Sequence, residues 1–155
     1  MDDRVESAEL DRLIPETEVV PAVNQIQVHP YYTQPVWRAA NERHGILTQS
    51  WSPIGGAYNY RGADTNPLED PVVTALAQKY GKTGAQVVLR WHLDHGFSAI
   101  PKSVRPHRIA ENFDVFDFIL TADEVASIDA LDTGVRGGPD PDSLNLNDHG
   151  WVIPD

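Results

Sequence analysis

Hydrophobic and polar positions follow two periodicities along the chain. Short apolar runs predict strands over residues 19–28, 46–51 and 97–100. Apolar residues spaced three and four apart predict helices between and after these runs. The expected helices cover residues 8–14, 35–44, 71–80, a segment from 83 onwards, 106–112 and 121–131. Strands that alternate with helices indicate a parallel α/β arrangement.

Residue types with known conformational preferences mark the expected helix ends. Hydroxyl side chains satisfy free N–H groups at a helix start, and glycine ends a helix in a left-handed conformation. The candidate starts are Ser7, Thr33, Thr83 and Thr121, the last with Glu124 in a capping box, and the candidate ends are Gly45 and Gly81. These signals support the helix assignments independently of the apolar pattern.

Composition narrows the functional classes. Hydrophobic residues make up 41% of the chain, which is typical of a globular protein, and the net charge of −11 argues against binding to nucleic acid or anionic membranes. No apolar run reaches the roughly 18 residues of a membrane span, and the acidic N-terminus does not resemble a signal peptide. The chain lacks cysteine, so thiol chemistry is excluded, and a reducing cytoplasm is the default location. His92 and His95 have metal-ligand spacing but no evident third ligand, so we expect no metal.

The strongest chemical signal lies in residues 100–112, IPKSVRPHRIAEN. Lys102 and Ser103 follow a predicted buried strand, and Pro106 can begin a helix at its first turn. Arg108, at the start of that helix, adds a guanidinium that fits a phosphate. Helix N-termini favour anions. The segment therefore predicts a phosphate-binding site, with an ordinary solvated helix start as the alternative.

Three stretches resemble the aldo-keto reductases. IPKSVRPHRIAENFDVFDF is similar to the last strand and helix of that family, VNQIQVHPYYTQ to its sixth strand, and GILTQSWSPIGG to its seventh. They occur in family order and together span roughly residues 7 to 145. The resemblance implies part of a (β/α)8 TIM barrel, namely strands six to eight with their helices. We expect one partial domain over residues 1–155, with residues 134–155 as a surface tail.

The resemblance also implies a set of NADPH contacts. Gln25 matches the residue that binds the nicotinamide carboxamide, Trp51 an aromatic ring that stacks on the nicotinamide, and Ser52 and Ile54 residues along the pyrophosphate. Lys102, Ser103 and Arg108 match the 2′-phosphate contacts, and Glu111 and Asn112 the adenine contacts. The cations favour NADPH over NADH. Each of these residues also has a purely structural interpretation, as a core, strand or helix-surface residue.

The family's catalytic Asp, Tyr, Lys and His have no counterpart in this sequence. In the family all four precede the segment that matches Val23, and residues 1–5 stand where the fifth strand should end. A (β/α)8 barrel needs about 250 residues, whereas this chain has 155. We expect half a barrel, with unpaired strand edges near residues 23–27 and 97–100. Barrel-filling side chains would lose their facing partners; the candidates are Ile26, Val28, Leu47 and Ile100.

Two functional hypotheses remain. In the first, the chain is a piece of a reductase that converts small aldehydes and ketones to alcohols, completed by further sequence or by a complementing half-barrel chain; self-association of this chain alone would instead favour the second. In the second, it is a non-catalytic nucleotide-binding or assembly protein derived from that family. Under either hypothesis the isolated chain should have little or no reductase activity. Trp151 is expected either to contact substrate or to anchor the tail.

Overall fold

The computed structural model describes residues 8–55 and 66–136. Along the chain these residues form α1 (Ala8–Glu16), β1 (Val23–Gln27), α2 (Pro35–Arg43), β2 (Leu47–Trp51), η1 (Pro67–Glu69), α3 (Pro71–Tyr80), α4 (Gly84–Asp94), β3 (Ser98–Ala99), α5 (Pro106–Phe113) and α6 (Ala122–Asp129). The predicted order of strands and helices is confirmed. The strands are shorter than expected. The Ser7 cap, Trp151 and most of the predicted tail lie outside the described residues.

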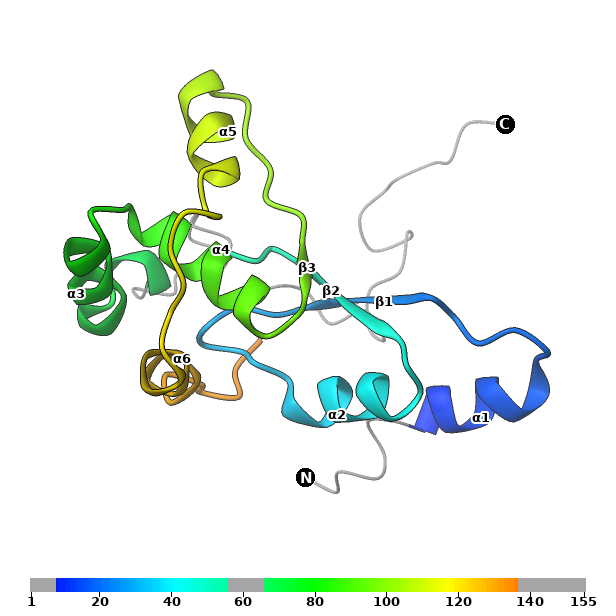
Figure 1. Cartoon of the computed structure of the whole chain (residues 1–155). Helices are drawn as coiled ribbons and strands as arrows, with labels where there is room; N and C mark the ends of the chain where they lie inside the picture. Colours follow the sequence, from blue (N-terminus) through cyan, green and yellow to red (C-terminus); the bar gives the residue numbers. More distant parts are fainter. Residues whose placement is uncertain (1–7, 56–65, 137–155) are drawn as a thin grey trace, which may run out of the picture.

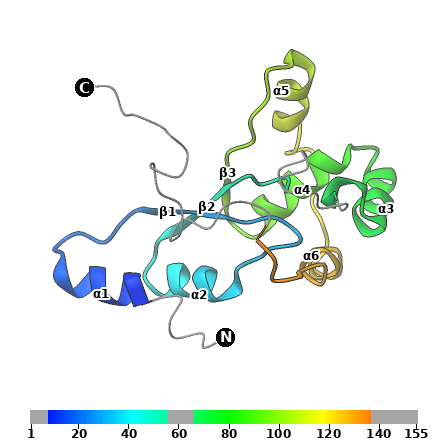
Figure 2. The same cartoon turned by 180° about the vertical axis from the view of Figure 1, so that it is seen from behind.

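The three strands form one parallel sheet in the order β1-β2-β3. Val23 pairs with Leu47 and Gln49 with Ser98, so the strands are in step across the sheet. Within the described sheet β1 and β3 are therefore the edge strands, as predicted. Helices α1 and α2 lie on one side of the strands, α3, α4 and α6 form a group beside them, and α5 stands apart at the end of the loop from β3 (Figures 1 and 2).

The main core lies between the sheet and α4, α3 and α6. Val28, just after β1, packs with Val87, Val88 and Trp91 of α4, and all four side chains are fully buried. Ile128 of α6 closes the other side of this cluster. Apolar residues of the predicted α4 stripe thus face the core as the helical spacing indicated.

Alternate residues of a strand point to opposite faces of its sheet, and the two faces here differ greatly. Ile26 and Val28 lie on the face that packs against helices, so their prediction as barrel-filling residues is wrong. The prediction missed the register, which places the odd-numbered positions of β1 on the other face. Leu47 and Ile100 lie on that open face and are 42% and 41% exposed.

The helix ends follow the predicted chemistry with one exception. Thr121 and Glu124 form the expected capping box, Thr83 forms another with Gln86, and Gly45 and Gly81 adopt left-handed conformations. Thr33 does not cap α2, because its hydroxyl donates to Asp132 instead. Gln34, with φ of 49°, is the residue that precedes α2. A distant carboxylate therefore overrode the local capping signal.

Candidate cofactor site

A row of polar side chains crosses the open face of the sheet. Gln25 in the middle of β1 donates from Nε2 to Oε1 of Gln49 at 2.6 Å, and Gln49 donates from Nε2 to Ser98 Oγ at 3.1 Å. Gln25 is exposed. Amide groups in this position can exchange hydrogen bonds with a carboxamide ligand. Gln49 was not predicted as a site residue, although its parity with Trp51 in β2 places both on one face.

The turn after β2 carries three of the predicted cofactor residues. Trp51 ends the strand and is half-buried, Ser52 has a left-handed φ of 48°, and Ile54 packs on the core. The N–H of Gly55 donates to the Ser52 carbonyl at 2.9 Å. A Cβ on Gly55 would come within 2.3 Å of Pro67 Cγ, so this turn and η1 pack too closely for a side chain there.

The loop after β3 places Lys102 and Ser103 beyond the same end of the sheet. The N–H of Ile100 still donates to the Ser50 carbonyl at 3.1 Å, which keeps the start of the loop beside β2. Ser103 Oγ accepts from the N–H of Arg105 at 3.1 Å, whereas Lys102 extends into solvent. The loop is thus held at both ends and leaves its lysine exposed.

Helix α5 presents Arg108, Glu111 and Asn112. It begins with Pro106, and Arg105 at its N-cap makes no side-chain hydrogen bond to the first turn. Arg108 is exposed, and the ion pairs among the described residues join other side chains. An uncapped helix start with an unshared guanidinium fits a phosphate group. The assignment of Lys102, Ser103 and Arg108 as 2′-phosphate contacts stays a prediction.

Apart from Gln25 in the middle of β1, the predicted residues follow the ends of the strands, in three groups that remain separate. Trp51, Ser52 and Ile54 follow β2, Lys102 and Ser103 follow β3, and the α5 residues lie beyond the β3 loop (Figure 1). No side-chain hydrogen bond or ion pair between described residues joins any two members of the predicted set. A bound molecule that spans the groups would have to supply the contacts between them.

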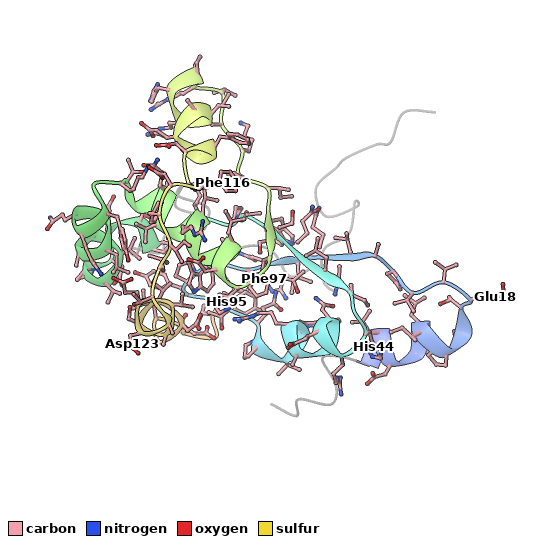
Figure 3. The ribbon with its side chains drawn as sticks, in the orientation of Figure 1. Glu18, His44, His95, Phe97, Phe116 and Asp123 are labelled. Carbon is pink, nitrogen blue, oxygen red and sulfur yellow. The ribbon has the colours of Figure 1, made fainter. Side chains whose placement is uncertain are left out.

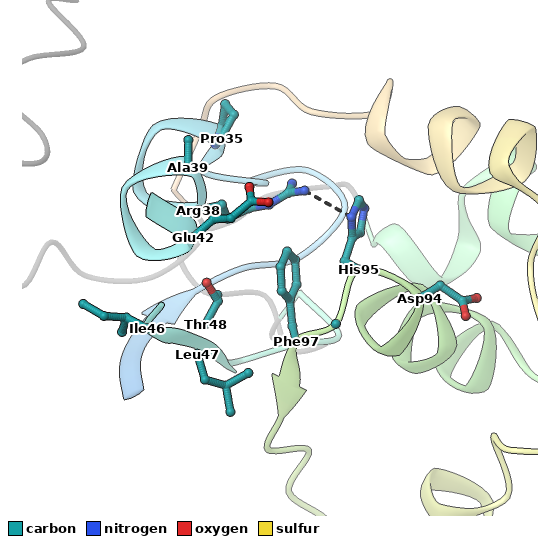
Figure 4. Close-up of a pocket in the computed structure, with 11 residues that line it drawn as sticks. Pro35, Arg38, Ala39, Glu42, Ile46, Leu47, Thr48, Asp94, His95 and Phe97 are labelled. Carbon is teal, nitrogen blue, oxygen red and sulfur yellow. Dashed lines mark hydrogen bonds between the residues drawn. The ribbon is translucent and has the colours of Figure 1, made fainter. Parts of the chain in front are cut away.

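A cleft of about 520 Å³ lies elsewhere, between α2, the start of β2 and the end of α4 (Figure 4). It contains none of the predicted cofactor residues. Arg38 on its wall lies 4.8 Å from the centre of the Phe97 ring and 3.2 Å from His95 Nδ1, and burial lowers its pKa. Glu42 lines the same wall. One half-buried arginine beside an acid offers a phosphate little net positive charge.

Figure 3 shows His95 and Phe97 side by side between the helix groups, and their rings stack at 5.1 Å. His95 Nε2 lies 2.9 Å from Asp129 Oδ1, and the Trp91 indole N–H donates to the same oxygen. His95 thus links α4 to α6. Its hydrogen bonds account for it as a structural residue.

Two buried histidines were not predicted as site residues. His92 on α4 is fully buried between β2 and the turn that follows it, and burial lowers its pKa to about 3. His29, just after β1, lies 3.2 Å from Gln27 Nε2, and burial lowers its pKa to about 4. Both are neutral near pH 7. The apolar stripe of α4 indicated that His92 faces the core, but its partners depend on the tertiary structure.

The family model for the aldo/keto reductase family matches residues 3–133. The chain belongs to the aldo/keto reductase family. A morphine 6-dehydrogenase of Pseudomonas putida is 54% identical over 144 residues, which cover 90% of this chain and 49% of that protein. The methylglyoxal reductase DkgA of Escherichia coli K12 is 53% identical over 135 residues, which cover 87% and 47%.

Solved aldo-keto reductases have the same arrangement of elements. Gox0644 superposes with a TM-score of 0.80 at 42% identity, covering 90% of this chain and 49% of Gox0644. An aldo-keto reductase of Bombyx mori in complex with NADP has a TM-score of 0.80 at 38% identity, covering 88% and 45%. A Gox0644 mutant has been crystallised with NADPH. The chain spans about half the length of the relatives it matches, and its sheet is consistent with part of a barrel. Within the described residues no helix is long and apolar enough to cross a membrane.

Proposed function

We propose that this chain is the cofactor-binding half of an NADPH-dependent reductase that acts on small aldehydes or ketones. The carrying observation is the pair of exposed cations, Lys102 and Arg108, beside the uncapped start of α5 and the end of β3. The similarity to a methylglyoxal reductase and to structures that contain NADPH or NADP supports the same class of reaction. Bound NADPH would supply the hydride that reduces the carbonyl carbon.

The roles of the side chains follow from their places around the strand ends. Lys102, Ser103 and Arg108 would hold the 2′-phosphate by charge and by hydrogen bonds, and Glu111 and Asn112 would contact the adenine. Ser52 and Ile54 would lie along the pyrophosphate. Trp51 would present one face of the nicotinamide, and Gln25 would bind its carboxamide. Gln49, which is hydrogen-bonded to Gln25, would keep that amide in place.

Turnover requires groups that we do not assign to this chain. We assign no side chain here to proton donation at the carbonyl oxygen, which normally contributes a large rate factor. The open face of the sheet and α5 expose apolar side chains, including Leu47 at 42% and Phe113 at 77%. We therefore propose that the missing strands are supplied by a complementing half-barrel, by a second copy, or by further sequence of the same polypeptide.

Cofactor binding is tested with Lys102→Ala and Arg108→Ala. We expect each change to weaken NADPH binding about tenfold, the value of one charge-assisted contact, and to leave NADH binding nearly unchanged. Binding is measured by tryptophan fluorescence, for the chain alone and after addition of the half of Gox0644 that this chain does not cover. Lys79→Ala is the control, because this lysine lies on α3 beside Glu124. Equal losses for NADPH and NADH would contradict the proposed 2′-phosphate site.

Turnover is tested with the same two preparations. The pure chain should not oxidise NADPH in the presence of methylglyoxal, whereas the mixture with the Gox0644 half should. Rapid turnover by the pure chain would show that one of its own side chains donates the proton. It would contradict the proposal that this chain is only the cofactor-binding half.

A non-catalytic nucleotide-binding role is the second candidate. The observation that favours it is the exposed pair Lys102 and Arg108 beside the uncapped start of α5, which would hold a nucleotide phosphate without any catalytic group. NADPH binding that persists without any gain of turnover on addition of complementing halves would support this candidate over the first.

A further inference from the structure

His92 connects the last strand positions of β2 to the turn that follows. Its Nε2 lies 2.9 Å from the Pro53 carbonyl oxygen, and its Nδ1 lies 3.2 Å from Ser50 Oγ. A carbonyl can only accept, so Nε2 carries the proton and Nδ1 accepts from the Ser50 hydroxyl. The two contacts lie on either side of Trp51 and Ser52. One imidazole on α4 thus holds both ends of the segment that carries the predicted nicotinamide contact.

The surroundings of His92 keep this arrangement in one protonation state. The side chain is fully buried beside the rings of Trp91 and Phe97. Burial is the main cause of its lowered pKa, and the charges of His95, His29 and Arg38 act in the same direction, opposed by the hydrogen bond to Pro53. The neutral tautomer with its proton on Nε2 therefore persists across the physiological pH range.

The turn itself has a conformation that needs support. Ser52 has φ of 48°, a left-handed value that is unfavourable for a residue with a side chain, and Gly55 has φ of 79°. Such conformations persist only where the surrounding structure determines them. Between these two positions, the Pro53 carbonyl is bound by His92. Loss of that bond would leave a buried carbonyl without its donor and would allow the turn to relax.

We propose that His92 is a positioning residue for the cofactor site, which fixes Trp51, Ser52 and Ile54 where the nicotinamide and pyrophosphate bind. The proposal rests on the function proposed above. It assigns to His92 no contact with the cofactor and no part in proton transfer. Its effect passes through the hydrogen bond from Nε2 to the turn, and the bond from Ser50 orients the ring.

Three substitutions separate these contacts. His92→Gln retains an N–H near the position of Nε2, His92→Asn retains a polar group near Nδ1 but is too short to bond Pro53, and His92→Leu removes both. We expect NADPH binding to weaken on the order of tenfold in His92→Asn and His92→Leu, and only about threefold or less in His92→Gln. Energy transfer from Trp51 to bound NADPH should fall in the same order. His44→Gln, at the end of α2, is the control and should bind as the wild type does.

Affinity is measured in the complemented mixture, and the backbone amide signals of Trp51, Ser52, Ile54 and Gly55 are recorded by NMR without cofactor. Shifts confined to this turn in His92→Asn, together with weaker NADPH binding, are the expected result. If His92→Leu does not fold, the difference in NADPH affinity between His92→Gln and His92→Asn tests the proposal. Equal NADPH affinity of the wild type and His92→Asn would overturn the positioning role alone. A wild-type mixture that does not bind NADPH would overturn the proposed function, whatever the turn spectrum shows.

Discussion

The two faces of the parallel sheet differ in how completely other parts of this chain cover them. On the helix-covered face, Val28 and Ser50 are fully buried, and Asn41 of α2 donates to Thr48 while its side-chain oxygen accepts from Asn24. On the open face, Leu47 is 42% exposed, and Gln25 has its amide partner in a row open to solvent. The three strands therefore have one face that helices cover and one face that is open to solvent.

This difference separates the part of the chain that stabilises the fold from the part that carries the proposed cofactor contacts. The helix-covered face supplies most of the stability of the fold, because the buried apolar clusters lie between this face and the helices. The open face and the neighbouring strand ends carry the proposed cofactor contacts. The part of the molecule that should bind ligand is thus the part that packing within the chain constrains least, and His92 is a link between the two.

The largest difference in unfolding free energy should appear between substitutions of a buried and of an exposed isoleucine. Ile128 is fully buried in the main core, whereas Ile119 is 67% exposed. We expect Ile128→Ala to lower the free energy of unfolding by about 3 kcal/mol, through lost burial and a cavity, and Ile119→Ala to change it by about 0.5 kcal/mol or less. Urea denaturation measures both. Equal losses of unfolding free energy would mean that Ile119 is packed as closely as Ile128 in solution.

Lowering the pH should destabilise the fold through its buried histidines before it protonates the surface carboxylates. Burial lowers the pKa of His29 from 6.5 to about 4, partly opposed by Asp132, so the unfolded chain binds its proton more readily. Stability from this group is complete above about pH 6.5 and is lost as the pH falls towards 4, by about 3 kcal/mol in total. His92 acts in the same direction. Burial raises the pKa of Glu124, but hydrogen bonds from Lys79 and Tyr80 outweigh it and lower the pKa to about 2, so the stability from this group is present above about pH 4.5 and is lost only below that pH.

The measurement is the unfolding free energy between pH 7 and 4, for the wild type and His29→Gln. The variant should show a flatter slope in this window, and His107→Gln, on the exposed face of α5, should follow the wild type. A slope unchanged by His29→Gln would show that His29 is accessible to protons in the folded state.

Exposed apolar side chains of α5 should contribute to association rather than to the stability of the isolated chain. Phe113 at the end of α5 is 77% exposed, and its ring contacts that of the exposed Phe116. We expect Phe113→Ser to weaken binding to the complementing Gox0644 half about tenfold, as for an interface aromatic residue, with no loss of stability in the isolated chain. Gln78→Ser, on α3, is the matched exposed control. Sedimentation of the mixtures measures the affinity, and an unchanged value would exclude this end of α5 from the interface.

The smallest effect is expected in the polar row. Gln49→Ala removes the partner of Gln25 and of Ser98, but solvent reaches this face and replaces the lost bonds. We expect a change in unfolding free energy of about 0.5 kcal/mol and a loss of NADPH affinity of a few-fold. A large loss of stability would show that the face is closed to water, as it would be in an assembled barrel.

The sequence alone determined the alternation of strands and helices, the capping box at Thr121, the left-handed glycines at 45 and 81, and the family. These follow from local preferences and from motifs, which neighbouring residues are sufficient to express. It also placed the candidate phosphate contacts after one strand, where the fold keeps them.

Only the tertiary structure decided which side of each strand is covered. It placed Ile26 and Val28 against helices, because strand register and helix position set the faces jointly. It redirected Thr33 to Asp132, whose carboxylate is 99 residues away in sequence. It also joined His92 to Ser50 and Pro53, 42 and 39 residues away. Such partners are brought together by packing of the whole chain, so no local pattern could predict them.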